Sequence, residues 1–157
     1  MFFKLNKNVI YLKNLDVNKL KQNINVKGLL NKEESGIYIY ESRQYKILNY
    51  KIKPRIFLLI KYEVNSIEII CKKIDLNIDS KINSILHIKI DVKIKKFNQG
   101  IKLERVMELG LVNEEKLKIM PNAIKEFLLD KAISISSKRF DKRLIKKIVE
   151  LESYSSS

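Results

Sequence analysis

The stretch Leu86–Ile94, with the sequence LHIKIDVKI, alternates apolar and polar residues without interruption. Leucine, isoleucine and valine occupy every second position, and histidine, lysine and aspartate fill the others. Because successive side chains of a β-strand point to opposite faces of its sheet, this pattern predicts a strand with one buried and one solvated face. The following Asn98-Gln99-Gly100 then predicts a hairpin turn.

Further alternating stretches lie on both sides of this strand. After the turn, one phase holds the apolar residues Ile101, Leu103, Met107, Leu109 and Leu111. Before it, Ile56, Leu58, Ile60, Tyr62 and Val64 share a phase, and a tight turn is predicted at Asn65-Ser66. The next phase runs through Ile67, Ile69 and Cys71, and it slips at Lys72-Lys73, where a β-bulge would restore the register.

Two more strand-like stretches lie nearer the start of the chain. Phe2–Leu12 predicts a first strand, with Phe3, Leu5, Val9 and Tyr11 on one phase. Asp16 is a good N-cap for a short helix over 17–23. The stretch Ile37–Leu48 is also typical of a strand.

The period of the apolar residues changes from two to a helical one after Pro121. Proline is favoured at the start of a helix, and the helical pattern runs from Asn122 to about Glu152. A first apolar stripe consists of Ile124, Phe127, Leu128 and Ile135, and a second of Phe140, Leu144, Ile148 and Leu151. The serine-rich stretch Ile133–Ser137 is the place where a kink or break is expected, because serine and β-branched residues are mediocre helix formers.

This order of elements predicts the α+β fold class. We expect one domain over residues 1–157, in which a curved antiparallel sheet of about six strands (about 2–112) grips a long C-terminal helix (about 122–152). Residues 153–157 are expected to form a frayed tail. No stretch reaches about 18 apolar residues, so no transmembrane helix is expected.

The composition suggests partners but no chemistry. The formal net charge is +14, mostly from lysine, which favours either an anionic partner or simply an AT-rich gene with many Lys, Ile and Asn codons. With a single cysteine, Cys71, and a single histidine, His87, neither a disulfide nor a Cys/His zinc site is expected. We identify no catalytic residues, no metal ligands and no cofactor motif.

Arg105 is the one charged residue on an otherwise apolar phase, between Leu103 and Met107. A charge that points into a core is costly unless it is paired. Arg105 could therefore meet a carboxylate or the polar head of a bound ligand. The alternative is a register shift, or a side chain that extends to solvent at the sheet edge.

The last helix also carries a basic run. We treat its members as candidates for contact with an anionic partner surface; they are Lys138, Arg139, Lys142, Arg143, Lys146 and Lys147. A basic amphipathic helix can lie on an anionic membrane, but it can equally pack its apolar stripe on its own sheet. Aromatic and basic residues also mix loosely around Tyr38, Tyr40, Tyr45 and Tyr50, which keeps an RNA-associated module as an alternative.

Certain positions carry a resemblance to a known family. They are Ile52–Arg55, Leu58 with Ile60, Ile67–Ile69, Cys71–Ile74, Pro121 with Ile124, and Arg143–Ile148. Through these positions the chain, from about Tyr11 to Glu152, resembles an uncharacterised family from cyanobacteria and plastids that looks like a compact START-like (SRPBCC, helix-grip) domain. It departs from that family in its Lys and Asn content, and in Asn113–Glu115, where a proline-rich connector is usual.

The resemblance implies a cavity between sheet and helix that holds a lipid, a pigment or another apolar ligand. The candidate cavity residues are Tyr38, Tyr40, Arg105, Phe127 and Leu128. The expected function is that of a non-enzymatic plastid protein that binds such a ligand or assists photosynthetic membrane complexes. The alternatives are an RNA- or ribosome-associated module and a helix-grip enzyme that acts on an apolar substrate.

The expected location is the plastid stroma, with peripheral contact to anionic thylakoid membrane. The start of the chain has neither a secretory signal nor the composition of a transit peptide, so we expect synthesis within the plastid. The expected partners are an apolar small molecule or a photosynthetic protein complex; nucleic acid is the less favoured partner.

Overall fold

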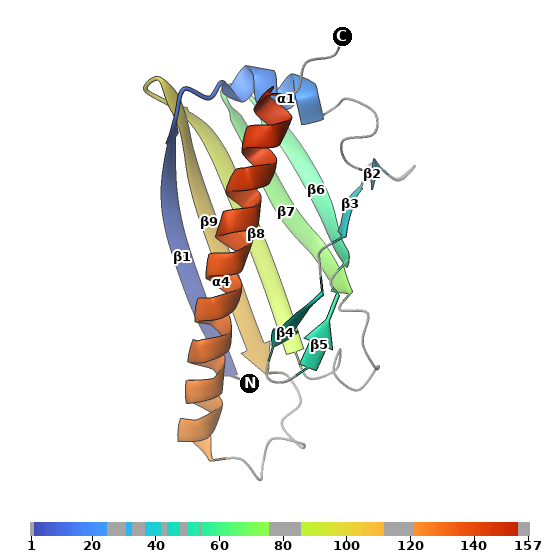
Figure 1. The fold of residues 1–157 in the computed structure, drawn as a ribbon, viewed down its shortest axis with the longest axis vertical. Helices are drawn as coiled ribbons and strands as arrows, with labels where there is room; N and C mark the ends of the chain where they lie inside the picture. The colour runs from blue at the N-terminus through green and yellow to red at the C-terminus, as the bar shows by residue number, and fades with distance from the viewer. Residues whose placement is uncertain are drawn as a thin grey trace.

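A curved antiparallel sheet with a long helix across one of its faces forms the molecule (Figure 1). The computed structural model describes residues 2–24, 31–32, 37–41, 44–47, 50–53, 55–75, 86–111 and 121–153. The predicted fold class, a helix-grip arrangement of sheet and C-terminal helix, is confirmed.

The described residues form these elements in chain order: β1 (Phe2–Lys13), α1 (Val17–Ile24), β2 (Asn31–Lys32), β3 (Tyr38–Glu41), β4 (Tyr45–Ile47), β5 (Tyr50–Ile52), β6 (Arg55–Glu63), β7 (Ser66–Asp75), β8 (Leu86–Phe97), β9 (Gly100–Leu111) and α4 (Asn122–Ser153). Within these residues, the main sheet has seven strands in the order β1-β9-β8-β7-β6-β3-β2, and β4 pairs with β5 in a small separate sheet. The short β2 adds one strand to the six expected.

The β8–β9 hairpin at the centre of the sheet follows the sequence closely. Phe97 pairs with Gly100, so the predicted turn has two residues, Asn98 and Gln99. Asn98 takes a positive φ of 49°, which asparagine tolerates better than most residues. Gly100 is required for a different reason, since a Cβ atom there would lie 2.1 Å from the carbonyl oxygen of Leu12.

The β6–β7 hairpin contains the predicted bulge. Phe57 pairs with Lys73 while Leu58 pairs with Cys71, so Lys72 is the extra residue. The bulge prediction at Lys72-Lys73 is therefore confirmed. The turn itself lies one residue earlier than expected, at 64–65, and β7 already begins at Ser66.

Strand β1 exists as predicted, but its most apolar phase faces outward. Phe3, Leu5, Val9 and Tyr11 are all exposed. β1 is an edge strand, and its other phase faces α4. On this phase, Asn8 donates a hydrogen bond to Asp141 of α4, and Asn6 accepts one from Arg105. The alternation of residues alone cannot tell which face of a strand meets the core.

The predicted strand Ile37–Leu48 is wrong as a single element. The described residues there form two short strands, β3 and β4, which belong to different sheets. Residue 112, the expected end of the strand region, and residues 154–157 of the expected tail lie outside the described residues.

Helix α4 is one continuous helix of 32 residues that runs through the serine-rich stretch. Ser137 donates a hydrogen bond from its hydroxyl to the Ser134 carbonyl oxygen at 3.2 Å, so this side chain is satisfied within the helix. The expected break at Ile133–Ser137 is thus absent. No helix among the described residues is long and apolar enough to span a membrane.

The second apolar stripe of α4 packs into the core as expected. The first stripe is wrong at Phe127 and Ile135, and the side chains of Ile124 and Leu128 lie outside the described residues. Phe127 is 65% and Ile135 41% exposed, whereas Leu129 and Ile133 are buried. A helix presents a single face to a sheet, and continuing the Phe140–Leu151 stripe backwards at helical spacing leads to Ile133 and Leu129. The stretch before Ser134 contains several apolar residues, and only this phase distinguishes the buried ones.

Helix α1 closes one end of the layer between sheet and α4 (Figure 1). The Asn18 amide donates a hydrogen bond to Asp16 Oδ1 at 2.9 Å, which confirms the predicted N-cap. At its other end, Asn23 donates from Nδ2 to the carbonyl oxygens of Leu151 and Glu152, at 2.5 and 3.2 Å. These carbonyls lie in the last turn of α4 and have no partner within the helix, so α1 also caps α4.

The docking of α4 can be tested with two adjacent substitutions. Ile148 is 3% exposed and Val149 is 44% exposed. We predict that Ile148→Asp lowers the free energy of unfolding by more than about 3 kcal/mol, since it removes buried apolar surface and buries a charge. Val149→Asp should change it by less than about 1 kcal/mol. Urea unfolding measures both; equal losses would contradict the orientation of α4.

Candidate functional site

An apolar cavity of about 130 Å³ lies between α4, α1 and the concave face of the sheet. An engineered cavity of about 150 Å³ in another protein stays dry and binds benzene, so a cavity of this order of volume suits a small apolar group. The cavity is partly open to solvent.

The strands and the helices contribute about equally to the cavity wall. The lining residues from the strands are Tyr40, Ile56, Leu58, Ile60, Ile69, Ile88, Ile90, Val92, Ile94, Met107 and Leu109. Those from the helices are Leu20, Ile24, Ser136, Arg139, Phe140, Arg143, Leu144, Lys147, Ile148 and Leu151. The strand side is thus apolar except for the Tyr40 hydroxyl.

The cavity exists because α4 does not lie centrally over the sheet. Its contacts with the sheet are mainly to β1 and β9, at one side. The inner faces of β6, β7 and β8 therefore stay apart from the helix, and side chains such as Leu58, Ile69 and Ile88 are only partly buried. Apolar surface that is neither packed nor freely exposed is characteristic of ligand-binding cavities.

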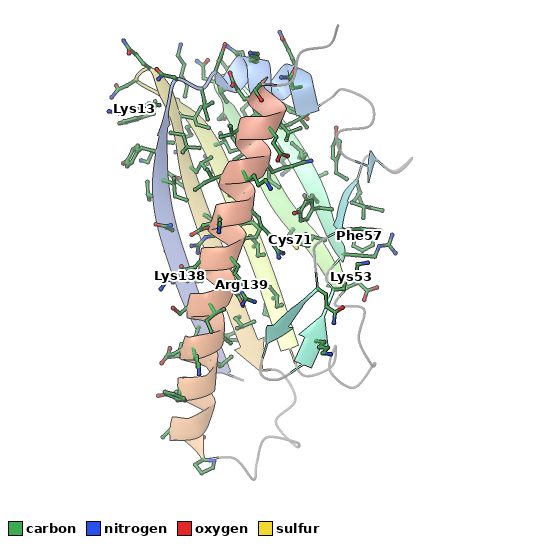
Figure 2. The ribbon with its side chains drawn as sticks, viewed as in Figure 1. Lys13, Lys53, Phe57, Cys71, Lys138 and Arg139 are labelled. Atoms are coloured by element: carbon green, nitrogen blue, oxygen red, sulfur yellow. The ribbon has the colours of Figure 1, made fainter. Side chains whose placement is uncertain are left out.

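The charged lining residues all come from α4. Arg139, Arg143 and Lys147 are spaced by four residues, so they follow one side of the helix. Figure 2 shows Arg139 on the side of α4 towards β7, whereas Lys138 points to the side of β1. None of the described lining residues is an aspartate or a glutamate.

The six basic residues predicted to contact an anionic partner surface therefore divide into two groups. Arg139, Arg143 and Lys147 line the cavity. The others, Lys138, Lys142 and Lys146, are exposed and lie outside its lining.

Arg105 lies outside the cavity lining and is 2% exposed. Its Nε donates to Asp141 Oδ1 at 2.7 Å, and its Nη2 donates to Asp141 Oδ2 at 2.6 Å, which is a bidentate pair between β9 and α4. Its Nη1 donates to the carbonyl oxygen and to Oδ1 of Asn6, at 2.8 and 2.7 Å. Among the alternatives expected for Arg105, the structure therefore shows pairing with a carboxylate, that of Asp141.

Asp141 receives a further hydrogen bond from Asn8 Nδ2, at 2.9 Å. The network thus joins β1, β9 and α4 through two asparagines, one arginine and one aspartate. Burial of two charges is tolerable only when such hydrogen bonds compensate for the lost water. Because its geometry is directional, this network fixes where α4 crosses the sheet.

The remaining cavity candidates differ in their placement. Tyr40 lines the cavity. Tyr38 is 4% exposed and outside the lining; burial and then a side-chain hydrogen bond with Tyr38 raise the pKa of the Tyr62 hydroxyl above its ordinary value. Phe127 is exposed and does not line the cavity. The Leu128 side chain lies outside the described part of the structure.

Sequence reasoning missed Asp141 as the partner of Arg105. The available signal was that Asp141 is the single acidic residue within the basic run from Lys138 to Lys147. An isolated acid on the border of an apolar helix stripe and an isolated arginine on an apolar strand phase are natural partners. Among the described residues, no group of side chains is arranged to hold a metal ion.

The architecture and the cavity together define a class: a helix-grip, START-like fold with an apolar cavity between its sheet and its C-terminal helix. Solved structures are similar in fold to the chain over nearly its whole length, although their sequences are not similar. No family model matches the chain, and no curated protein matches it either.

The similar structures include the di-domain ARO/CYC BexL from the BE-7585A biosynthetic pathway, with a TM-score of 0.53 and 6% identity over 98% of this chain. The chain spans 51% of BexL, about half its length. Ara h 8.0201 has a TM-score of 0.51 and 10% identity, and covers 98% of this chain and 100% of its own. A START superfamily protein from Mycobacterium smegmatis has a TM-score of 0.42 and 9% identity, covering 90% of this chain and 97% of its own. At these identities the likeness concerns the fold alone.

The buried network gives a second testable prediction. Asp141→Asn should lower the free energy of unfolding by about 3–5 kcal/mol, because it leaves the Arg105 charge buried without a counter-charge. The control is Asp130→Asn, also in α4, where the carboxylate is 61% exposed and lies 3.2 Å from Lys4 Nζ. That change should cost less than about 1 kcal/mol.

A double variant tests whether the loss of stability comes from the unpaired buried charge. Arg105→Met with Asp141→Leu should be more stable than Asp141→Asn alone, because no unpaired charge remains. Chemical unfolding followed by circular dichroism measures all three. If Asp141→Asn were as stable as the unsubstituted protein, the network would not hold the helix.

Proposed function

We propose that this protein binds an apolar small molecule in the cavity between its sheet and α4. The observation that carries the proposal is the cavity of about 130 Å³, whose strand wall is apolar except for one tyrosine hydroxyl. Leaving such a wall without a ligand forgoes the contacts that a filled cavity would provide. A ligand that fills it would recover them, which is a direct driving force for binding.

The proposal also includes a cellular location and a biological role. We propose a plastid protein of the stroma that contacts thylakoid membranes peripherally and holds a lipid or pigment, or assists photosynthetic complexes. Its support is the resemblance of the sequence to a cyanobacterial and plastid family and the abundance of Lys, Ile and Asn. Fractionation of the host with an antibody tests it: recovery outside the plastid would contradict this setting.

The alternative functions stay predictions. An RNA-associated module needs aromatic side chains accessible on a sheet face. Of the tyrosines expected to serve it, Tyr38 is buried and Tyr40 lines the cavity, whereas the exposed aromatic side chains of the sheet, Phe3, Tyr11, Tyr62 and Phe97, are others. A helix-grip enzyme needs polar groups that converge on the ligand, and here these are Tyr40, Ser136 and the three basic residues of α4. The binding role requires less of the site than either alternative.

A cavity-filling substitution tests the proposed binding. Ile69 lines the cavity, and its neighbour Ile70 lies on the opposite face of β7. Ile69→Trp should weaken binding of the neutral apolar dye N-phenyl-1-naphthylamine by at least about tenfold, because the indole occupies the ligand volume. Ile70→Trp should leave it within about twofold of the unsubstituted protein, since this side chain is outside the cavity.

Dye fluorescence titrations, excited at a wavelength that tryptophan does not absorb, give the affinities, because each variant carries one introduced tryptophan and the native chain has none. Thermal unfolding of both variants confirms that they are folded. Absence of dye binding by the unsubstituted protein, or equal effects of the two substitutions, would contradict a ligand function for the cavity.

A further inference from the structure

Part of the apolar pattern in the α4 sequence lies on the side of the helix that faces away from the sheet. Phe127 and Ile135, which the sequence groups in one stripe, are exposed, and Val149 near the end of the helix is exposed as well. Single exposed apolar residues are ordinary on protein surfaces. These three, however, share one side of α4 with a set of lysines, so the combination requires an explanation of its own.

The lysines of this side are Lys131, Lys138, Lys142 and Lys146, and all of them are exposed. With roughly 3.6 residues per helical turn, these lysines and the three apolar residues fall within about 100° of arc around α4. In Figure 2, Lys138 lies at the β1 side of the helix. We call this set the exposed face of α4; its members are Phe127, Lys131, Ile135, Lys138, Lys142, Lys146 and Val149.

The acidic residues of α4 all lie outside this arc; they are Glu126, Asp130, Asp141, Glu150 and Glu152. Asp141 is buried against Arg105, and Asp130 contacts Lys4 of β1. Among the described residues, no ion pair involves a lysine of the exposed face. The face therefore presents a strip of positive charge and favours an anionic partner.

The outer face of the sheet also combines lysines with exposed aromatic side chains, but it balances its own charge. Glu104 lies 3.6 Å from Lys95 and 3.3 Å from Lys102, and Glu108 lies 2.9 Å from His87. Carboxylates are thus interleaved with the cations there. Of the two surfaces, the exposed face of α4 is the better match for an anionic partner.

The shape and chemistry of the exposed face fit a lipid bilayer best. From Phe127 to Val149 it extends for about 33 Å along one continuous helix. Lysines can place their charges among lipid head groups while apolar neighbours enter the boundary below them. A nucleic acid would attract the lysines but gain nothing from the apolar side chains. Protein interfaces gather apolar residues at a compact centre and are depleted in lysine.

We propose that the exposed face of α4 binds the protein to the surface of an anionic lipid bilayer. This inference rests on the peripheral membrane contact in the proposed function and assigns the residues that make that contact. The lysines contact the head groups, and Phe127, Ile135 and Val149 enter the boundary between head groups and acyl chains. The opposite side of α4 stays packed on the sheet, so the helix binds as part of the folded protein.

Vesicle flotation with the full-length protein, at about 0.1 M salt, tests the proposal. One set of vesicles is phosphatidylcholine alone, and the other contains about 30% phosphatidylglycerol. Each lysine near an anionic surface contributes about a fivefold gain in affinity. The protein should therefore bind the anionic vesicles at least about a hundredfold more tightly than the neutral ones.

Two quadruple variants that remove the same charge locate the contact. Lys131→Gln with Lys138→Gln, Lys142→Gln and Lys146→Gln should weaken binding to the anionic vesicles by at least about fiftyfold. The control replaces four exposed lysines on the outer face of the sheet by glutamine: Lys7, Lys13, Lys61 and Lys89. The control should lose no more than about fivefold, because charges far from the bilayer are screened by salt.

A third variant tests the apolar part of the contact. Phe127→Ser should weaken binding to anionic vesicles by at least about threefold, because the ring no longer enters the boundary region. Phe97→Ser, which removes an exposed ring at the end of β8, should leave it within about twofold. Binding of polyuridylate should be the same in both variants. All substituted side chains are exposed, and melting curves establish that each variant is folded.

Three results would overturn the proposal. They are equal binding to neutral and anionic vesicles, equal losses in the two lysine variants, and vesicle binding by Phe127→Ser that equals that of the unsubstituted protein. The last result, together with loss of polyuridylate binding in the α4 lysine variant, would instead assign the face to a nucleic acid. None of the substituted residues lines the cavity. Dye binding without vesicles therefore tells a failure of this inference from a failure of the ligand function.

Discussion

The structure depends on the buried pair between Arg105 of β9 and Asp141 of α4, reinforced by Asn6 and Asn8 of β1. Apolar contacts can hold a helix on a sheet in many nearby positions, whereas a bidentate ion pair has one geometry. This pair draws α4 towards the β1–β9 side of the sheet. The cavity over β6, β7 and β8 is the consequence, because the helix that closes it cannot also settle into it.

Charge is therefore used in two ways on opposite sides of one apolar helix stripe. On one side, Asp141 is buried and neutralised by Arg105, which serves the position of the helix. On the other side, Arg139, Arg143 and Lys147 line the cavity. A residue buried in a saturated network has no capacity left for a ligand. Arg105 is thus not suited to hold the polar head group of a ligand.

The sequence predicted those parts of the fold that depend on local pattern. Strand alternation located β8 and β9, the parity slip at Lys72-Lys73 located the bulge, and Asp16 marked the start of α1. It failed where only tertiary contacts decide. The outward phase of β1 is as apolar as an inward one, and Phe127 and Leu129 are equally apolar although only Leu129 is buried. The Arg105–Asp141 pair joins residues 36 positions apart, and a single sequence does not show which residues of β9 and α4 lie opposite each other. The cavity depends on that pair, and of the cavity residues expected from the sequence only Tyr40 is in the described lining.

The most direct measurement of the central claim is a methyl NMR titration of isotope-labelled protein with the apolar dye N-phenyl-1-naphthylamine. The account predicts that the isoleucine methyl groups of the cavity wall, those of Ile69 and Ile88 above all, shift in a saturable manner with one ligand per chain. It also predicts that Ile70, on the outer face of the same strand as Ile69, remains unchanged. Shifts confined to the outer face of the sheet, with Ile69 and Ile88 silent, would contradict it.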